Sequence, residues 1–284
     1  MEHGLGEWLP VVMPGAQTFE IASARTGETY RILVRVPAEP APARGWPVLW
    51  TLDGDASFPL VFTQPARGLF PPATGSTGGT GVVVAVGFPG GAPFDAPARS
   101  RNYTPAPDRD TGDRVSTQFG GASDFLHFLT RELRPALAAR LPLDPARNTL
   151  FGFSYGGLFT LHTLVAHPGH FQRYWAASPS LWFSDGLMMR CLRRQPPVTD
   201  AQGLVVTVGR DEQFPAHSLP AARMAHLARR AMVDNVSEAA GLIARANPGL
   251  RLELVVAADH DHFDMLMHGA RRVQAVAFGD DQAD

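Results

Sequence analysis

The chain has 284 residues, of which 45% are hydrophobic and 18% are charged, so it can bury a large core. Its formal net charge of -2 argues against a nucleic-acid partner, because such proteins usually carry a basic excess. The chain contains no lysine, which excludes Schiff-base catalysis and a Walker-A nucleotide site. The single cysteine, Cys191, excludes an internal disulfide framework and a multi-cysteine metal site.

The sequence offers no signal for a membrane segment. No uninterrupted apolar run approaches the roughly 18 residues that a membrane-spanning helix needs. Residues 1–10 lack the cationic stretch and following apolar stretch of a secretory leader. We therefore expect a cytoplasmic protein without a membrane partner.

Short β-type runs recur along the chain. Residues 17–25 and 28–36, joined by a turn at Thr26-Gly27, predict an antiparallel hairpin. Six further strands are expected in apolar runs, at residues 47–52, 81–86, 148–153, 174–177, 204–208 and 250–257. Several of these runs are apolar on both faces, which is typical of a parallel sheet covered by helices on each side.

Helical patterns alternate with these strands. They cover residues 119–141, 158–166, 216–246 and 261–278. This alternation predicts a doubly wound, mostly parallel α/β sheet, and no break in composition divides residues 1–284 into more than one domain. Residues 88–116 hold five prolines and show little periodicity, so we expect a long loop there, near the active site.

One motif carries chemistry. Gly152-Phe153-Ser154-Tyr155-Gly156 lies directly after an apolar run and before a helical one, the context of a G-x-S-x-G nucleophile. Glycines are needed because side chains two residues before and after the serine would collide in so tight a turn. Ser154 is the predicted nucleophile, and the backbone N–H of Tyr155 is expected to donate to the oxyanion.

A serine nucleophile needs a neighbouring imidazole to take its proton. In this fold the histidine follows the last strand, where the chain has His260, His262 and, further on, His268. We predict His260 as the base, because it comes immediately after the strand, and keep His262 as the alternative. A metal ion held by His260 and His262 is disfavoured, since the sequence offers no third ligand beside them.

The acid of a triad is expected after the strand at 204–208. Asp211 and Glu212 both lie there, and either carboxylate could fix the tautomer of the imidazole. We predict Glu212, with Asp211 as the alternative. A dyad of serine and histidine without an acid remains open.

With these residues in place, the sequence resembles the esterase-D-like branch of the α/β hydrolases, and most of all bacterial siderophore esterases of the ferric-enterobactin type. The resemblance spans about residues 17–277. The motifs that carry it lie at residues 47–54, at Arg99-Ser-Arg-Asn-Tyr-Thr-Pro105, at the serine turn, at Ser178-Pro-Ser-Leu-Trp182, at residues 208–212 and at Asp259-His260.

The resemblance implies further roles. It gives Asp55 as a second backbone donor to the oxyanion, Arg99 as a residue that reaches the substrate carbonyl or its anionic groups, and Glu212 as the third triad member. Trp182 is either an aromatic platform for the substrate or a core residue. Two departures, Asn102 for an aspartate and Asp261 for a small residue, leave the substrate open.

The residues and the resemblance together predict a serine esterase that works through a covalent acyl-enzyme, with a small-molecule ester as substrate and no cofactor or metal. A siderophore trilactone is the expected ester. The alternatives are a general carboxylesterase or acyltransferase on small acyl esters, and a hydrolase-fold protein that only binds its ligand.

Overall fold

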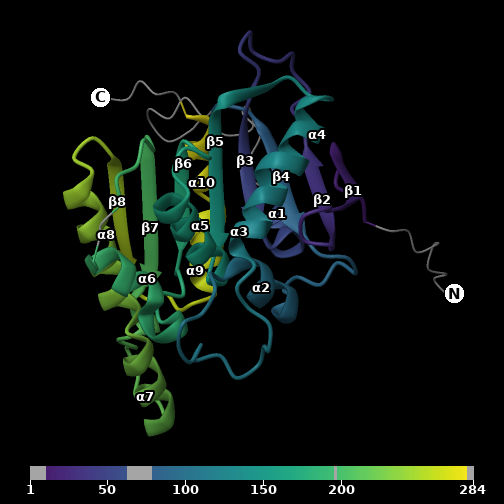
Figure 1. Ribbon diagram of the computed structural model, residues 1–284. Helices are drawn as coiled ribbons and strands as arrows, with labels where there is room; N and C mark the ends of the chain where they lie inside the picture. The colour runs from purple at the N-terminus through teal and green to yellow at the C-terminus, as the bar shows by residue number, and fades with distance from the viewer. Residues whose placement is uncertain (1–10, 63–78, 195–196, 280–284) are drawn as a thin grey trace, which may run out of the picture.

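A mixed sheet of eight strands runs through the residues that the computed structural model describes, which are 11–62, 79–194 and 197–279 (Figure 1). Its order is β1-β2-β4-β3-β5-β6-β7-β8. The strands are β1 (Ala16–Ala22), β2 (Thr29–Arg35), β3 (Trp46–Leu52), β4 (Val82–Gly87), β5 (Leu143–Phe153), β6 (Arg173–Ala177), β7 (Gly203–Gly209) and β8 (Arg251–Ala257). Residues 1–10, on which the expectation about a leader rested, lie outside the described ranges.

The amino-terminal hairpin is confirmed. β1 pairs with β2 and β2 pairs with β4 in antiparallel register, whereas every later pair from β3 to β8 is parallel. Every residue of β3, β4 and β6 is buried, as expected for strands covered on both faces.

Helices cover both faces of this sheet, which confirms the doubly wound architecture (Figure 1). One face is packed by α2 (Ala96–Tyr103), α3 (Ala122–His127), α5 (Tyr155–Ala166), α6 (Phe183–Arg194) and α8 (Met232–Ala246). The other face is packed by α1 (Gly54–Phe62), α9 (Asp264–Ala270) and α10 (Val273–Phe278). Parallel strands β3 to β8 all end at the same edge, so the residues that follow them are brought together there.

The helix expected at residues 119–141 is a continuous helical segment with a change of pitch. It consists of α3, a π-helical turn at Phe128–Leu133 and α4 (Arg134–Ala138). Pro135 has no N–H to donate to the preceding turn, which is a common reason for such a local change in the bonding pattern.

Two expected helices are each divided in the structure. The segment 216–246 contains α7 (Ala221–Arg230) and α8, separated by Ala231 in the left-handed conformation with φ of 45°. The segment 261–278 contains α9 and α10, which are separated at Arg271 and Arg272. No glycine or proline lies at the first break, so the sequence carried no signal for it, whereas Gly269 lies two residues before the second.

The segment 88–116 is not a loop throughout. It contains α2, which begins after Asp95, whose side chain accepts a hydrogen bond from the backbone N–H of Ala98 at 2.9 Å. The prolines misled the sequence prediction because one of them, Pro97, lies in the first turn of the helix, where a missing N–H costs nothing. Residues 104–116 are irregular.

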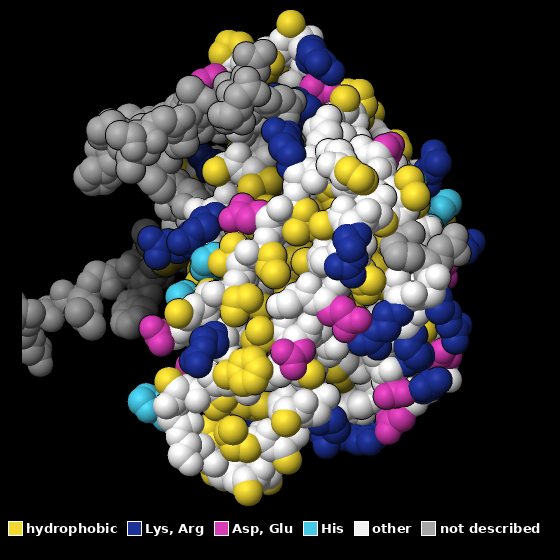
Figure 2. All heavy atoms as spheres, turned by 90° about the vertical axis from the view of Figure 1, so that its left-hand side faces the viewer, with side chains coloured by type: hydrophobic (Ala, Val, Ile, Leu, Met, Phe, Trp, Pro, Cys, Tyr) yellow, Lys and Arg dark blue, Asp and Glu magenta, His cyan; other side chains and the backbone are white. Residues whose placement is uncertain are grey.

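β8 is the edge strand on the side of the molecule viewed in Figure 2, where hydrophobic side chains lie between scattered charged ones. Its Leu254 and Val256 are exposed. Scattered apolar side chains of this kind are normal on a protein surface. Within the described ranges, no helix is both long and apolar enough to cross a membrane.

Candidate active site

Ser154 occupies the turn between β5 and α5 in a strained conformation, with φ of 61° and ψ of -115°. The glycines around it are required by space. A Cβ atom on Gly152 would lie 2.1 Å from the carbonyl oxygen of Gly156, and one on Gly157 would lie 2.7 Å from that of Ala177. The turn therefore has the close packing expected of a nucleophile elbow.

A histidine and a carboxylate lie in line with this serine. The Nε2 atom of His262 is 3.1 Å from the Oγ atom of Ser154, and its Nδ1 atom is 2.6 Å from the Oε2 atom of Glu212. The three side chains follow β5, β8 and β7, which end at the same edge of the sheet. The arrangement is a hydroxyl, imidazole and carboxylate in contact, with the geometry of a catalytic triad.

The prediction that His260 lies beside the serine is wrong, because His262 occupies that position. His260 follows a sharp turn at Asp259, whose φ is 55°, and its Nδ1 atom lies 2.6 Å from the carbonyl oxygen of Ala258. Its ring faces His268 at 5.6 Å between centroids. The structure thus brings His262, two residues after His260, against Ser154.

Glu212 is the carboxylate that contacts His262. It is buried, and its Oε1 atom accepts hydrogen bonds from the hydroxyl of Ser178 at 2.5 Å and the backbone N–H of Gly209 at 2.8 Å. These donors leave the Oε2 atom for His262. The alternative, Asp211, makes no hydrogen bond with either histidine through its side chain among the described residues, and its buried Oδ1 atom has no partner there.

Tyr155 is the first residue of α5, so its backbone N–H has no acceptor within the helix and can donate to an oxyanion. Asp55 is in the first turn of α1, and its carboxylate forms an ion pair with Arg31. Burial raises the pKa of Asp55, and Arg31 offsets part of this effect. The role of its backbone N–H as a second donor stays a prediction.

Arg99 lies on the wall of the cleft beside Ser154, and a buried carboxylate holds it there. Its Nε atom donates to the Oδ1 atom of Asp53 at 2.7 Å, and its Nη2 atom donates to the carbonyl oxygen of Phe153 at 3.3 Å. Burial raises the pKa of Asp53, and the charge of Arg99 opposes this rise. The sequence prediction did not include Asp53, although it directly follows β3 at the edge where ligand sites form.

Ser180 is a second residue that sequence reasoning missed. Its Oγ atom lies 3.4 Å from that of Ser154, it is 1% exposed, and its backbone N–H donates to the carbonyl oxygen of Ser154 at 3.2 Å. The Ser178-Pro-Ser-Leu-Trp182 motif was visible in the sequence, but only the fold places its second serine beside the nucleophile.

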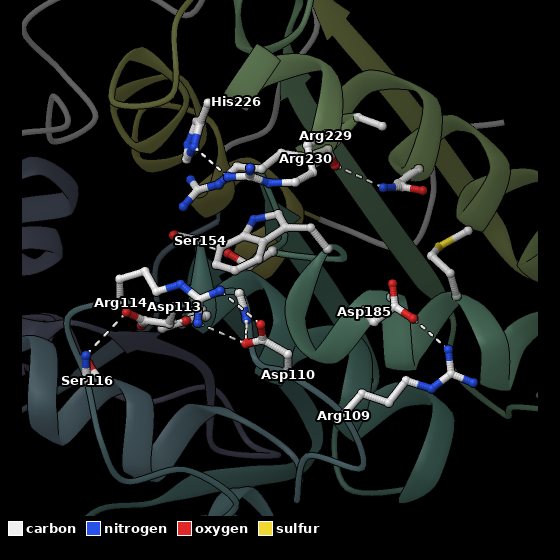
Figure 3. Close-up of a pocket in the computed structure, with 18 of the residues that line it drawn as sticks. Arg109, Asp110, Asp113, Arg114, Ser116, Ser154, Asp185, His226, Arg229 and Arg230 are labelled. Carbon is white, nitrogen blue, oxygen red and sulfur yellow. Dashed lines mark hydrogen bonds and ion pairs between the residues drawn. The ribbon is translucent and has the colours of Figure 1, made fainter. Parts of the chain in front are cut away.

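A cleft of about 1040 Å³ opens over Ser154 (Figure 3). Its walls come from the 104–116 segment, the start of α5, the start of α6 and the end of α7. Trp182 also lines it and is half-buried, with its ring 6.0 Å from that of Tyr155. The described residues contain no group of three or more His, Cys, Asp or Glu side chains suited to hold a metal ion.

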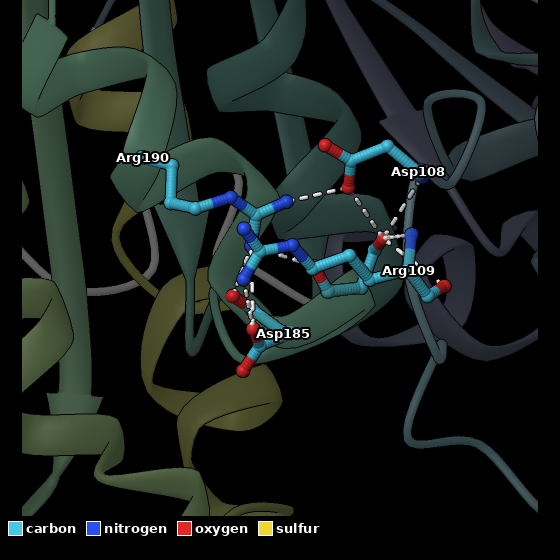
Figure 4. Close-up of polar contacts among 5 residues, drawn as sticks. Asp108, Arg109, Asp185 and Arg190 are labelled. Atoms are coloured by element: carbon cyan, nitrogen blue, oxygen red, sulfur yellow. Dashed lines mark hydrogen bonds and ion pairs between the residues drawn. The ribbon is translucent and has the colours of Figure 1, made fainter.

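Ion pairs connect the 104–116 segment to α6 (Figure 4). Arg109 pairs with Asp185 at 2.6 Å, and Arg190 pairs with Asp108 at 2.5 Å. The same segment is tied to the nucleophile turn, because Asp113 accepts a hydrogen bond from the hydroxyl of Tyr155 at 2.8 Å. This wall of the cleft is thus anchored at both sides.

Comparison with known proteins places the chain among esterases. The model of the family described as "Putative esterase" matches residues 23–246. Ferri-bacillibactin esterase BesA of Bacillus subtilis is 33% identical over 186 residues, which is 63% of this chain and 63% of BesA. The siderophore triacetylfusarinine C esterase of Aspergillus fumigatus is 37% identical over 181 residues, which is 62% of this chain and 59% of that enzyme. The chain thus matches less than two thirds of the length of either relative.

A solved structure extends the similarity over nearly the whole chain. Siderophore hydrolase EstB from Aspergillus nidulans superposes with a TM-score of 0.79 at 26% identity, over 98% of this chain and 99% of EstB. The expected α/β-hydrolase fold is therefore confirmed.

Proposed function

The chain belongs to this esterase family, and we propose that it is a serine hydrolase that cleaves a siderophore ester through a covalent acyl-enzyme. The observation that carries the proposal is the contact of His262 with both Ser154, at 3.1 Å, and Glu212, at 2.6 Å. The rest of the site supplies what such a reaction needs, namely an N–H donor after the serine and an open cleft above it.

The proposed reaction is acyl transfer in two steps. His262 takes the proton of the Ser154 hydroxyl as its oxygen attacks the ester carbonyl, and the N–H of Tyr155 stabilises the resulting oxyanion. The C–O bond to the alcohol breaks, and His262 gives its proton to the leaving oxygen. A water molecule then attacks the acyl-enzyme and loses a proton to His262. The bond between the acyl carbon and the Ser154 oxygen breaks, His262 returns the proton to that oxygen, and the acid leaves.

Glu212 holds His262 during this cycle. With its other oxygen fixed by Ser178 and Gly209, the carboxylate accepts the Nδ1–H of His262 and leaves the Nε2 atom to receive the serine proton. The positive charge that forms on the imidazole is stabilised by the nearby carboxylate.

The choice of a siderophore as substrate rests on the relatives and on the size of the cleft. BesA, the Aspergillus fumigatus enzyme and EstB are each named for a siderophore. The cleft of about 1040 Å³ is at the upper end of the range for small-molecule sites, so it has room for a bulky ester.

Turnover measurements on paired substrates test the proposal. We expect release of hydrolysed product from a ferric siderophore triester, with a kcat/KM above that for p-nitrophenyl butyrate. Ser154→Ala removes both activities, whereas the exposed Ser218→Ala retains them. Turnover of the p-nitrophenyl ester alone would contradict the siderophore as substrate and favour a small acyl ester. Turnover of neither substrate by the folded protein would contradict the hydrolase proposal.

A further inference from the structure

The cleft over Ser154 carries more positive than negative charge. Six of its lining residues are arginines, and three are aspartates. The whole chain has a formal net charge of -2, so any attraction for an anion arises locally in the cleft and not from the overall charge.

Four of these arginines have carboxylate partners. The pairs are Arg99 with Asp53, Arg109 with Asp185, Arg114 with Asp110, and Arg193 with Glu238. Their charges are balanced within the protein. They shape the walls and contribute little free positive charge to a ligand.

Arg229 and Arg230 differ from the other four. They end α7, which contains no acidic residue, and within the described ranges neither forms an ion pair with a carboxylate. Among the described residues, the Arg229 side chain has its polar contact with His226, at 3.3 Å, and His226 is itself on the cleft wall. Both arginines lie on the rim of the cleft that contains Ser154 (Figure 3).

Arg230 is held in place by an aromatic ring. Its guanidinium carbon lies 4.1 Å from the centre of the Trp182 ring, which is the geometry of a cation–π contact. Gly112 lies against the same indole, since a Cβ there would be 3.4 Å from it. The platform expected at Trp182 therefore presents a guanidinium to the cleft in place of a free ring face.

Arg230 is also partly removed from water. Burial lowers its pKa, and the nearby Arg223 and Arg229 act in the same direction, while Tyr155 and Asp113 oppose them. A guanidinium has five N–H donors in one plane, and stacking on an indole leaves the donors at its edge free. A half-buried cation that forms no ion pair with a carboxylate in the described part of the chain is suited to a planar anionic group of a ligand.

We propose that Arg230, stacked on Trp182 and supported by Arg229, binds a planar carboxylate-type anion on the substrate and so sets a preference for anionic esters. The site lies on the nucleophile's side of the cleft, because the ring of Trp182 is 6.0 Å from that of Tyr155, the residue after Ser154. The inference rests on the proposed function for the identity of the ligand as substrate, but the binding of an anion is independent of turnover.

Calorimetric titration with benzoate, and with neutral benzamide as its matched partner, tests the site without catalysis. Removing a charged hydrogen-bond donor weakens binding of its anionic partner, so Arg230→Gln should raise the dissociation constant for benzoate about tenfold or more. Benzamide should bind equally to both proteins. Arg140→Gln, at an exposed side chain that does not line the cleft, is the control for net charge and should change the benzoate constant less than about twofold.

Each outcome separates this inference from the proposed function. Benzoate that fails to bind the wild-type protein, or that binds Arg230→Gln as tightly, overturns the anion site even if esters are hydrolysed. A loss that is equal in Arg230→Gln and Arg140→Gln overturns it as well, since general charge would explain it. Benzoate binding that depends on Arg230 in a protein that hydrolyses no ester supports the site and contradicts only the hydrolase.

Discussion

The Nε2 atom of His262 lies 3.1 Å from the Oγ atom of Ser154, although 108 positions separate them in the chain. The contact exists because β5 and β8 run parallel and end at the same edge of the sheet. We therefore propose His262, rather than its neighbour His260, as the general base.

Substitution of the two histidines separates their roles. His262→Ala should lower kcat/KM for p-nitrophenyl butyrate at least about 10³-fold, since the base of a serine hydrolase acts as a unit with its nucleophile. His260→Ala is the matched control and should stay near wild-type activity, because His260 contacts the carbonyl of Ala258 and the ring of His268, neither of which touches Ser154 in the described residues. The reverse result would restore His260 as the base.

The acid is tested in the same way. Glu212→Gln preserves shape but no longer accepts the Nδ1–H of His262 as a carboxylate does, so kcat should fall about 10²–10⁴-fold. Asp211→Asn should leave kcat unchanged, since no hydrogen bond joins its carboxylate to His262 in the described structure. Equal effects of the two substitutions would argue against Glu212 as the acid of the triad.

The elbow glycine is expected to be required for stability. Gly152→Ala places a Cβ 2.1 Å from the carbonyl oxygen of Gly156, a backbone atom that cannot move aside easily. Overpacking of this kind should lower the free energy of unfolding in urea by about 3 kcal/mol. Gly249→Ala, where the space is open, is the control and should change it little. A stable Gly152→Ala protein would contradict the close packing of the turn.

His162 in α5 predicts a pH dependence of stability. Burial lowers its pKa to about 4, and the charge of His167 adds to the effect. Below about pH 6.5 the His162 imidazole binds a proton in the unfolded chain, whereas in the folded chain it binds one only below about pH 4. The contribution of His162 to the free energy of unfolding should therefore be complete above pH 6.5. The free energy should fall by up to about 3 kcal/mol as the pH drops to 4.

The variant His162→Gln checks this assignment by urea unfolding at pH 4.5 and 7.5. It should show a smaller difference between the two pH values than the wild-type protein. His217→Gln, on the exposed surface, should keep the wild-type difference. An unchanged difference in His162→Gln would assign the effect to other groups.

Much of the architecture could be predicted because its signals are local. Every residue of β3 and β4 is buried, as are the last six residues of β5, and the serine turn has its glycines at fixed offsets. Those patterns follow from steric and burial rules that act within a few residues.

The choice between His260 and His262 depends on a longer-range effect. It is decided by the turn at Asp259, with its φ of 55°, and by the packing of that turn against the end of β7. A Cβ on Gly209 would lie 2.3 Å from the carbonyl oxygen of His260, so the backbone there is fixed by a strand more than fifty positions earlier. Periodicity and motif order contain no information on such a contact.

The same reason explains the other errors. The break between α7 and α8 occurs at an alanine, which favours helix, so tertiary packing overrode propensity there. Asp53 and Ser180 were missed because each lies in a motif whose other residues attracted attention, and only the fold shows their contacts with Arg99 and Ser154.

Mapping of the adduct formed with a fluorophosphonate probe tests the central claim most directly. Mass spectrometry of the digested protein should find the phosphonyl group on the peptide that contains Ser154, with full occupancy in wild type and His260→Ala, and little in His262→Ala. An adduct on another serine, or none on the folded wild-type protein, would contradict the account.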